Sequence, residues 1–328
     1  MSEPDERRPV PEQIISTPAV DVLFPGEANP TRSESLTNPA EVELRGEVQL
    51  SERKQARRES WRLIRRRPAF IIGVLIVVIW TVCAAFGDRI TPHSPLDFRA
   101  GTHLSPRAKF PFGTDEQGRD VLSRVMAGSR DVLKVAPLAA LLGVLFGVIV
   151  GMLMGYIGGW LDNAMGRVVE AFLALPVLLV ALLAVTTLGS SSAVVIGVVA
   201  ALFTPVVART VRSAVLAERD LDYVTSAKLR GESSVFVMFR EILPNVSGPI
   251  IVELTVRIGY AVFTVATLSF LGAGPQPPSP DWGAQVSGAF RVISAGIWWT
   301  TFFPAAAIAS LVIAVNLIAD SVQSVLEA

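Results

Sequence analysis

Long apolar runs with few charges constrain the fold of this chain more than any other feature of its 328 residues. A helix that crosses a membrane needs roughly 20 apolar residues. Six runs approach or exceed this length, and they cover residues 69–86, 136–157, 171–188, 193–208, 246–274 and 297–319. Charged residues make up only 18% of the chain, against about 25% in soluble domains. The sequence therefore predicts an all-α membrane protein with six transmembrane helices.

The N-terminal region has a different composition. Residues 1–50 contain seven prolines and ten acidic residues, with little periodic hydrophobicity. Such a segment buries too little apolar surface to offset its ordering entropy, so residues 1–60 are expected to form a disordered tail. Residues 51–67 carry eight basic and two acidic side chains directly before the first apolar run. This basic juxtamembrane block indicates a cytoplasmic N-terminus, and the six-helix domain is expected to cover residues 61–328.

The loops follow from this orientation. Six crossings from a cytoplasmic N-terminus place the C-terminus in the cytoplasm too. The loop at about 209–245, which carries six basic residues, then faces the cytoplasm, and the loop at about 87–135 faces outward. The outer loop carries eight basic residues against six acidic ones, but long loops follow the positive-inside rule less strictly. The first apolar run begins too late for a cleavable signal peptide and is expected to remain as a membrane anchor.

Several function classes are disfavoured by the composition. The formal net charge is zero, so no bulk attraction to nucleic acid is implied. Cys83 is the only cysteine, and His93 and His103 lack the usual zinc-ligand spacing, so neither a disulfide framework nor a metal site is expected. The chain contains no Gly-Lys pair and hence no Walker-type phosphate loop. No catalytic constellation is evident, so the chain is expected not to be an enzyme.

A polar stretch at 219–245 interrupts the apolar half of the chain. It contains a helix-like piece, Gly231, a second helix-like piece and then Leu243-Pro244. Glycine permits a left-handed turn at a helix end, and the second piece is expected to lie back against the membrane domain before Pro244 stops it. The first piece is expected to place three apolar side chains on one side: Leu221, Val224 and Leu229. Such a short helix can insert into a groove on a partner and act as a rigid lever.

Several segments resemble motifs of one transporter family. The polar stretch is similar to the cytoplasmic coupling loop of ABC-importer permeases, in which E-A-A-x3-G precedes I-L-P. The matching residues are Tyr223, Val224, Thr225, Ser226, Ala227, Gly231, Ile242, Leu243 and Pro244. Thr225 and Ser226 replace the Glu-Ala pair of that signature. The outer loop resembles the F-G-T-D-x-x-G-R-D stretch of dipeptide and oligopeptide permeases through Gly113, Thr114, Asp115, Gly118, Arg119 and Asp120.

Further matches to the same family follow in order along the chain. They are G-Y-I-G-G-W-L-D at 155–162, S-F-L-G at 269–272, Q-P-P-S-P-D-W-G at 276–283 and N-L-I-A-D at 316–320. Together the motifs cover roughly residues 62–325 and leave the N-terminal tail outside the resemblance. The chain is identified as a member of the dipeptide/oligopeptide permease family, which implies a type I ABC-importer permease architecture.

The resemblance implies a non-catalytic permease subunit in the bacterial plasma membrane that forms part of a pathway for di- or oligopeptides. The implied partners are a second, related permease, ATP-binding subunits, an extracytoplasmic substrate-binding protein and the lipid membrane. Residues 223–231 would dock on the ATP-binding subunit, which holds ATP and magnesium, so no cofactor is expected in this chain. Nickel, glutathione or haem are alternative cargoes within the family. A secondary transporter without ATP is the second hypothesis, and it predicts repeats and ionisable groups near the middle of the membrane.

Two charged residues enter the fifth apolar run. Glu253 and Arg257 are spaced i,i+4, so they can face each other on one helix. Charges inside a span are costly and often functional. Two interpretations stay open: a neutralised structural pair, which is favoured, or a pair that lines the transport pathway. In the second run, four glycines recur at every fourth position and predict close helix packing: Gly143, Gly147, Gly151 and Gly155.

Residues 120–135 favour an amphipathic helix that lies at the membrane surface. Its apolar stripe comprises Val121, Leu122, Val125 and Met126, with Arg124 and Arg130 outside the stripe. A scaffold role that braces the first two membrane helices is favoured over a role in receiving the binding protein.

Overall fold

The computed structural model describes residues 67–98, 100–276 and 278–326, so the expected N-terminal tail lies outside the described residues. This part of the chain is helical, with two isolated β-bridges and no strand. The long helices are α3 (Pro68–Ile90), α4 (Val121–Ile157), α5 (Gly159–Leu173), α6 (Val177–Leu188), α7 (Ser192–Glu218), α11 (Ser247–Phe270) and α13 (Trp299–Leu326). The shorter ones are α8 (Asp222–Leu229), α9 (Ser234–Phe236), η1 (Val237–Ile242), α10 (Leu243–Asn245), α12 (Trp282–Ala289) and η2 (Phe290–Ala295). The predicted all-α class is confirmed.

Among the described residues, five helices are long and apolar enough to cross a membrane: α3, α4, α7, α11 and α13. The sixth predicted span, residues 171–188, is not one straight helix. It is split between α5 and α6, which meet at an angle of 88°. Pro176 stands immediately before α6. Proline has no N–H to donate and its ring clashes with the preceding turn, so a straight helix cannot run through this position at low cost.

The second span is longer than predicted. Residues 120–135 were expected to form a separate surface helix, but they are the first part of α4, which continues through Pro137 to Ile157. The Asp120 carboxylate caps the start of α4 by accepting a hydrogen bond from the Ser123 N–H. The described outer loop therefore ends near residue 120.

The glycine stripe of α4 packs against α7 as predicted. A Cβ added at Gly147 would lie 2.5 Å from the Val207 Cβ, and one added at Gly151 would lie 2.6 Å from the Ala208 carbonyl oxygen. Gly143 would meet the Phe203 Cβ at 2.9 Å. Small residues let the two backbones approach closely enough for extensive van der Waals contact. The two helices therefore pack as one unit, and α8 follows α7 after a short turn.

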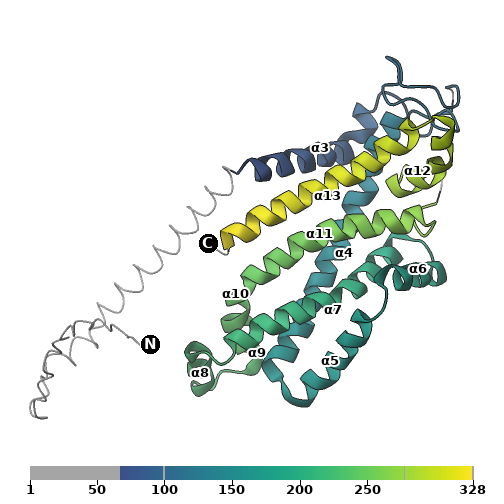
Figure 1. Ribbon diagram of the computed structural model, residues 1–328. Coiled ribbons are helices and arrows are strands. Elements are labelled where there is room, and N and C mark those ends of the chain that lie inside the picture. The colour runs from purple at the N-terminus through teal and green to yellow at the C-terminus, as the bar shows by residue number, and fades with distance from the viewer. Residues whose placement is uncertain (1–66, 99, 277, 327–328) are drawn as a thin grey trace, which may run out of the picture. The chain divides into compact units, whose positions relative to one another are not determined.

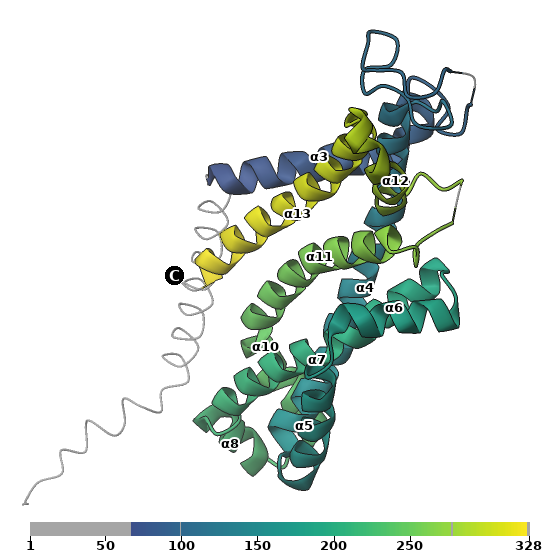
Figure 2. The same ribbon diagram turned by 45° about the vertical axis from the view of Figure 1, so that its right-hand side comes forward.

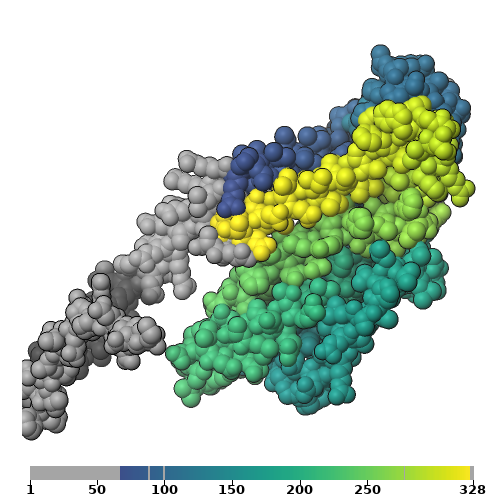
Figure 3. All heavy atoms as spheres, viewed as in Figure 1, coloured from purple at the N-terminus to yellow at the C-terminus, as the bar shows by residue number. Residues whose placement is uncertain are grey.

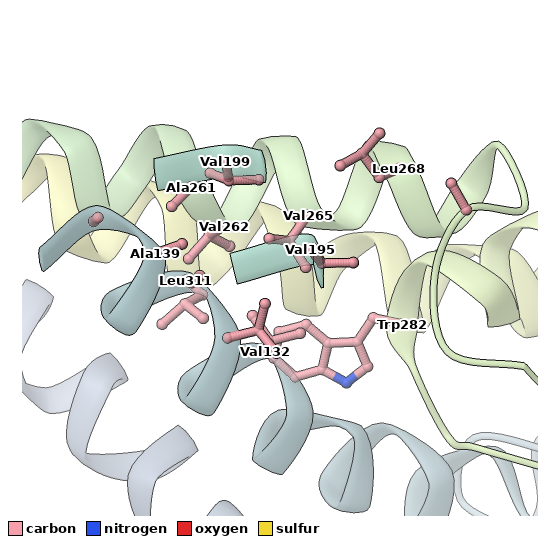
Figure 4. Close-up of a cluster of buried hydrophobic side chains, with 14 of the residues drawn as sticks. Val132, Ala139, Val195, Val199, Ala261, Val262, Val265, Leu268, Trp282 and Leu311 are labelled. Carbon is pink, nitrogen blue, oxygen red and sulfur yellow. The ribbon is translucent and has the colours of Figure 1, made fainter. Parts of the chain in front are cut away.

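The remaining long helices lie side by side. In Figures 1 and 3, α13 lies between α3 and α11, and α7 follows on the other side of α11. Figure 2 shows α4 crossing behind these helices. The largest apolar cluster lies where α4, α7, α11, α12 and α13 meet, with Trp282 at one end of the residues drawn in Figure 4. The buried Trp282 indole N–H donates to the Val125 carbonyl oxygen at 2.7 Å, and its ring meets Trp80 of α3 edge-on at 4.7 Å between centroids.

Candidate functional site

One face of α8 is anchored to the membrane domain and the other is exposed. Val224 and Ala227 are completely buried and belong to an apolar cluster that includes Met152 of α4 and Val211 of α7. Thr225 and Ser226, which replace the Glu-Ala pair of the family signature, are exposed. Since the replaced positions lie on the exposed face, the replacement does not alter the packing of α8 on the membrane domain.

The end of α8 has the left-handed cap that the sequence predicts. Gly231 has φ +77°, its N–H donates to the Lys228 carbonyl oxygen at 3.0 Å, and the Glu232 N–H donates to that of Ala227 at 3.2 Å. This pair of bonds is the Schellman pattern. A Cβ at Gly231 would meet nothing within 4 Å. The backbone conformation, and not lack of space, therefore favours glycine here.

The prediction that Leu221, Val224 and Leu229 lie on one side of α8 is wrong for two of the three residues. Leu229 is 84% exposed and Leu221, which precedes the helix, is half-exposed. An α-helix turns about 100° per residue, so a residue five positions after Val224 points about 140° away from it. Ala227, three positions after Val224, shares its face instead.

The second piece of the polar stretch packs back on the membrane domain, as expected. Val237, Met238 and Ile242 are buried in the same cluster as Val224. Pro244 does not end the helical segment as expected, because the helical conformation continues through α10 into α11. The π-helical η1 widens the turn directly before Pro244, so the missing N–H and the ring are accommodated there.

Exposed apolar side chains lie on both sides of Gly231 in the sequence, and the sequence analysis did not single them out as a surface. Leu229, Val235 and Phe239 are exposed. We call the exposed residues Thr225, Ser226, Leu229, Val235 and Phe239 the coupling surface. The signal that could have found this surface is helical spacing, because its apolar members fall on faces opposite to the buried Val224 and Val237.

Polar contacts fix α8 to α7 and α4. The Tyr223 hydroxyl donates to the Glu218 carboxylate at 2.6 Å, and Arg219 donates to the Gly155 carbonyl oxygen at 3.0 Å. Burial, together with the neighbouring Glu218 carboxylate, raises the pKa of Tyr223 to about 12. The Lys228 ammonium lies 5.4 Å from the centroid of the Tyr156 ring. These contacts connect α8 and the turn before it to the ends of both long helices.

The structure brings Glu253 and Arg257 together. Arg257 Nε lies 2.8 Å from Glu253 Oε2, and the Thr210 hydroxyl of α7 donates to Glu253 Oε1 at 2.8 Å. The Arg257 guanidinium also lies 5.1 Å from the centroid of the Tyr260 ring and 5.7 Å from that of Phe203. Both charges are largely buried and neutralised between α11 and α7. This environment fits the structural interpretation and leaves pathway lining untested.

The outer-loop motif forms a compact network. The Thr114 hydroxyl donates to the Gly101 carbonyl oxygen at 2.6 Å and accepts from the Leu104 N–H at 2.8 Å. Asp115 accepts from the Arg119 backbone N–H at 2.9 Å and from Arg119 Nε at 2.6 Å. The motif thus holds its own loop together rather than presenting free functional groups.

The glycines of the motif allow its backbone to pack closely against neighbouring segments. Gly113 and Gly118 both have positive φ, and a Cβ at Gly113 would lie 2.6 Å from the Trp299 Nε1 of α13. That indole N–H donates to the Thr114 carbonyl oxygen at 3.3 Å. The motif therefore ties the outer loop to the start of the last long helix.

Arg124 was expected outside the apolar stripe of its helix, but it is only 4% exposed. Its guanidinium donates to the carbonyl oxygens of Pro95 at 3.3 Å and Ser279 at 3.2 Å, and its Nε lies 3.6 Å from the Asp115 carboxylate. Burial is tolerated because backbone acceptors and a carboxylate surround the charge. Arg124 joins the two loops that precede α4 and α12.

The two histidines occupy different settings in the outer loop. His93 Nδ1 lies 3.4 Å from the Asp120 carboxylate, and the His93 backbone N–H donates to the Ser123 hydroxyl at 3.1 Å. His103 has φ 51°. The part of the chain that the structure describes contains no group of three His, Cys, Asp or Glu residues that could hold a metal ion.

The remaining family-like segments are mostly structural. Asp162 pairs with Arg212 of α7 at 2.5 Å, next to a turn in which Gly158 and Gly159 have positive φ. Asp281 is buried and caps α12 by accepting from the Ala284 N–H at 2.9 Å. Asn316 is exposed on α13, and a Cβ at Gly259 of α11 would lie 2.8 Å from its Oδ1.

Residues 147–328 match the family model described as "Binding-protein-dependent transport system inner membrane component", and residues 56–106 match "N-terminal TM domain of oligopeptide transport permease C". The chain is 40% identical over 280 residues to the dipeptide transport system permease protein DppC of Escherichia coli K12, which covers 82% of this chain and 92% of that protein. It is 35% identical over 270 residues to DppC of Bacillus subtilis, with 82% and 84% covered. It is 33% identical over 277 residues to the di/tripeptide transport system permease protein DppC of Pseudomonas aeruginosa, with 82% and 91% covered.

Proposed function

The chain belongs to the family of inner membrane components of binding-protein-dependent transport systems, and we propose that it forms part of a pathway for di- or oligopeptides driven by ATP hydrolysis in partner subunits. Several relatives are named as dipeptide or di/tripeptide permeases, which supports peptide as the cargo. Nickel, glutathione and haem are the alternative cargoes within this proposal. The chain is a multi-pass membrane permease. Its own proposed role is to conduct the substrate and not to catalyse ATP hydrolysis.

One observation carries the proposed coupling mechanism: α8 is capped at Gly231, buried through Val224 and Ala227, and exposed along its opposite face. A helix of this kind is a short rigid body. When an ATP-binding subunit moves the coupling surface, Val224 and Ala227 push on Met152 of α4 and on the α7 side chains in the same cluster. Because α4 and α7 are locked together by the glycine stripe, both helices respond to the push.

The proposed partners follow from this arrangement. ATP-binding subunits hold ATP and magnesium and dock on the coupling surface. A second, related permease completes the pathway, and an extracytoplasmic binding protein delivers the substrate. The coupling surface belongs to the cytoplasm, and the loop before α4 faces outward. Six crossings, with the α5–α6 pair taken as one, then place both termini in the cytoplasm. Residues 1–66, which include the basic block that supports this orientation, lie outside the described residues.

The rival hypothesis is a secondary transporter that needs no ATP. Glu253 and Arg257 are the charged pair that it would use near the middle of the membrane. In the structure they neutralise each other, with Thr210 as a third partner. This arrangement favours the ATP-driven permease.

The test is co-expression of this subunit with candidate ATP-binding and permease subunits, followed by ATP hydrolysis and uptake assays in proteoliposomes. Gly231→Trp should abolish docking or separate hydrolysis from uptake, because it disrupts the cap and covers the surface. Gly231→Asn is the matched control, since asparagine tolerates the left-handed conformation. If no ATP-binding subunit associates and the chain alone moves solute, the proposed function is wrong.

Cargo is tested separately in the same assembly. Uptake of dipeptides, nickel, glutathione and haem is measured with the cognate binding protein present. Peptide cargo is overturned if peptides are ignored and one of the other three is taken up.

A further inference from the structure

A small cavity lies between the outer loop and α12, and the proposed coupling mechanism does not use it. Figures 1 and 2 show the outer loop and α12 at the same end of the molecule. The cavity has a volume of about 120 Å³, and its ionisable lining residues are His103, Asp115, Glu116, Arg119 and Arg124. We call it the outer cavity. Ligands of drug size occupy pockets of roughly 300–1,000 Å³, so the outer cavity suits a small chemical group.

Two buried cations of the lining share one carboxylate. Arg119 is 8% exposed and Arg124 is 4% exposed. Asp115 Oδ2 lies 2.6 Å from Arg119 Nε and 3.6 Å from Arg124 Nε. Within the described part of the chain, these are the ion pairs of both arginines, and Glu116 is exposed. The buried cluster therefore carries an excess of positive charge.

Backbone contacts hold this charge in place without neutralising it. The Arg124 guanidinium donates to the carbonyl oxygens of Pro95 and Ser279. Carbonyl dipoles stabilise a buried cation, but they do not cancel its unit charge. Buried charges are normally paired with an opposite charge, because desolvation is costly. An anion that enters the outer cavity would therefore meet positive charge that the fold already fixes in position.

Two lining residues also have buried nitrogen atoms without a hydrogen-bond partner among the described residues. These atoms are Arg124 Nε and His103 Nδ1. The His103 backbone is fixed, since its N–H donates to the Asp115 carbonyl oxygen at 3.0 Å and its φ is 51°. Arg124 Nε is a donor, and His103 Nδ1 is one when it carries the proton. Orphaned buried polar atoms are uncommon, so a ligand that accepts hydrogen bonds here would satisfy groups that the fold does not.

We propose that the outer cavity binds a small carboxylate, whose negative charge balances the excess charge of Arg119 and Arg124. A guanidinium presents a planar fork of N–H groups that matches the two oxygens of a carboxylate better than a spherical ion. Arg119 already donates to Asp115 through Nε, so its terminal N–H groups are the ones that would meet the ligand.

Two sources offer this chemistry. One is a free small carboxylate, and the other is the C-terminal carboxylate of a peptide. The peptide source rests on the proposed function, because it requires peptide cargo, whereas carboxylate binding itself does not.

The experiment uses the full-length chain in nanodiscs at constant pH and ionic strength, with acetate as the probe. Acetate should bind in isothermal titration and raise the melting temperature, because it binds the folded state. Acetamide has nearly the same shape without the charge and should do neither. Chloride should bind more weakly than acetate. Equal effects of acetate and acetamide, or of acetate and chloride, would overturn the carboxylate assignment.

A charge variant tests the role of the arginines. Arg119→Gln should weaken acetate binding by at least about tenfold, since it removes a hydrogen bond from a charged donor. Arg291→Gln is the matched control, because Arg291 is an exposed arginine of η2 outside the lining of the cavity. It should bind acetate within about twofold of the wild type. Unchanged acetate binding in a folded Arg119→Gln protein contradicts the proposal.

A filling variant keeps the test decisive if Arg119→Gln does not fold. Ala289 lines the cavity from the last position of α12, so Ala289→Met should fill it and abolish acetate binding while both arginines remain. Ser287→Met is the matched control, since Ser287 lies on the same helix outside the lining. If Ala289→Met binds acetate as tightly as the wild type, the ligand does not occupy the outer cavity.

Competition with acetate identifies the source of the carboxylate. The competitors are a dipeptide with a free C-terminus and the same dipeptide with a C-terminal amide. Competition by the free dipeptide alone assigns the cavity to the peptide C-terminus, and competition by neither assigns it to a free carboxylate. Competition by both would overturn recognition through the carboxylate. Absence of any ATP-binding partner overturns the proposed function, whereas absence of acetate binding in a folded, ATP-coupled transporter overturns this inference alone.

Discussion

Tyr223 donates a 2.6 Å hydrogen bond to Glu218 across the turn that joins α7 to α8. Glu218 is the last residue of the membrane-spanning helix α7, and Tyr223 belongs to the first turn of α8. This bond is therefore a direct polar connection between α8, which carries part of the coupling surface, and the membrane domain.

Removing the Tyr223 hydroxyl should loosen this connection. We expect Tyr223→Phe to retain ATP hydrolysis while lowering uptake per ATP severalfold, because the buried faces of Val224 and Ala227 still hold α8 in place. Loss of a hydrogen bond to a charged group should cost about 1.5 kcal/mol of stability. Uptake and hydrolysis measured in the same proteoliposomes give the ratio. Glu218→Gln keeps an acceptor and should retain more coupling; if both variants are as well coupled as the wild type, the bond has no such role.

A side chain added at a glycine of the α4–α7 interface should destabilise the protein. Gly147→Ala places a Cβ 2.5 Å from the Val207 Cβ, so we expect a loss of about 1–3 kcal/mol from overpacking. Gly197→Ala on α7 is the matched control, since a Cβ there meets nothing within 4 Å. It should be neutral or slightly stabilising, because alanine favours a helix more than glycine does. Thermal unfolding in detergent measures both, and equal melting temperatures would contradict the close packing.

The Glu253–Arg257 pair offers a test between its two interpretations. If the pair is structural, Arg257→Met should destabilise the protein by about 3 kcal/mol, since it leaves Glu253 charged and unpaired. Adding Glu253→Gln should then restore most of the lost stability. If the pair lines the pathway, the double variant should be stable but impaired in uptake. Melting temperature and uptake rate, measured on the single and double variants, separate the two.

The sequence predicts most of the long helices because their signal is length and uncharged composition. Residues 69–86 fall within α3, and residues 299–319 of the last run fall within α13; both helices carry exposed as well as buried apolar residues. The break at Pro176 is harder to predict, because Pro137 and Pro205 lie inside unbroken helices. Proline alone therefore does not decide between a break and a tolerated kink; packing around the freed carbonyl does.

The helix α8 likewise has some features that the sequence predicts and others that it does not. Its position and the glycine cap could be read from the sequence, but the burial of Val224 against the membrane domain was not predicted. The direction of Leu229 could not be read from hydrophobicity, since a partner-facing leucine and a core leucine look alike along the chain. Arg124 is the converse case. The carbonyl groups of Pro95 and Ser279, from distant segments, together with the Asp115 carboxylate explain why a charged residue is buried there.

Asp281 provides a pH-dependent prediction outside the membrane-spanning helices. Burial raises the pKa of its carboxyl, opposed by the hydrogen bond from the Ala284 N–H. A folded-state pKa above the unfolded value means that the folded protein holds the proton more tightly. Stability from this group is thus present at pH values below the unfolded pKa and is lost as pH rises through the folded pKa.

Asp281→Asn should therefore stabilise the protein at neutral pH and flatten this part of the pH dependence, because asparagine keeps a helix-capping oxygen without the charge. Asp281→Ala also removes the charge but loses the cap, which should cost about 1 kcal/mol relative to Asp281→Asn. Melting temperatures of the three proteins between acidic and neutral pH measure both effects. A wild type whose stability rises with pH more steeply than that of Asp281→Asn would show the carboxylate to be favoured in the fold, and would contradict the raised pKa.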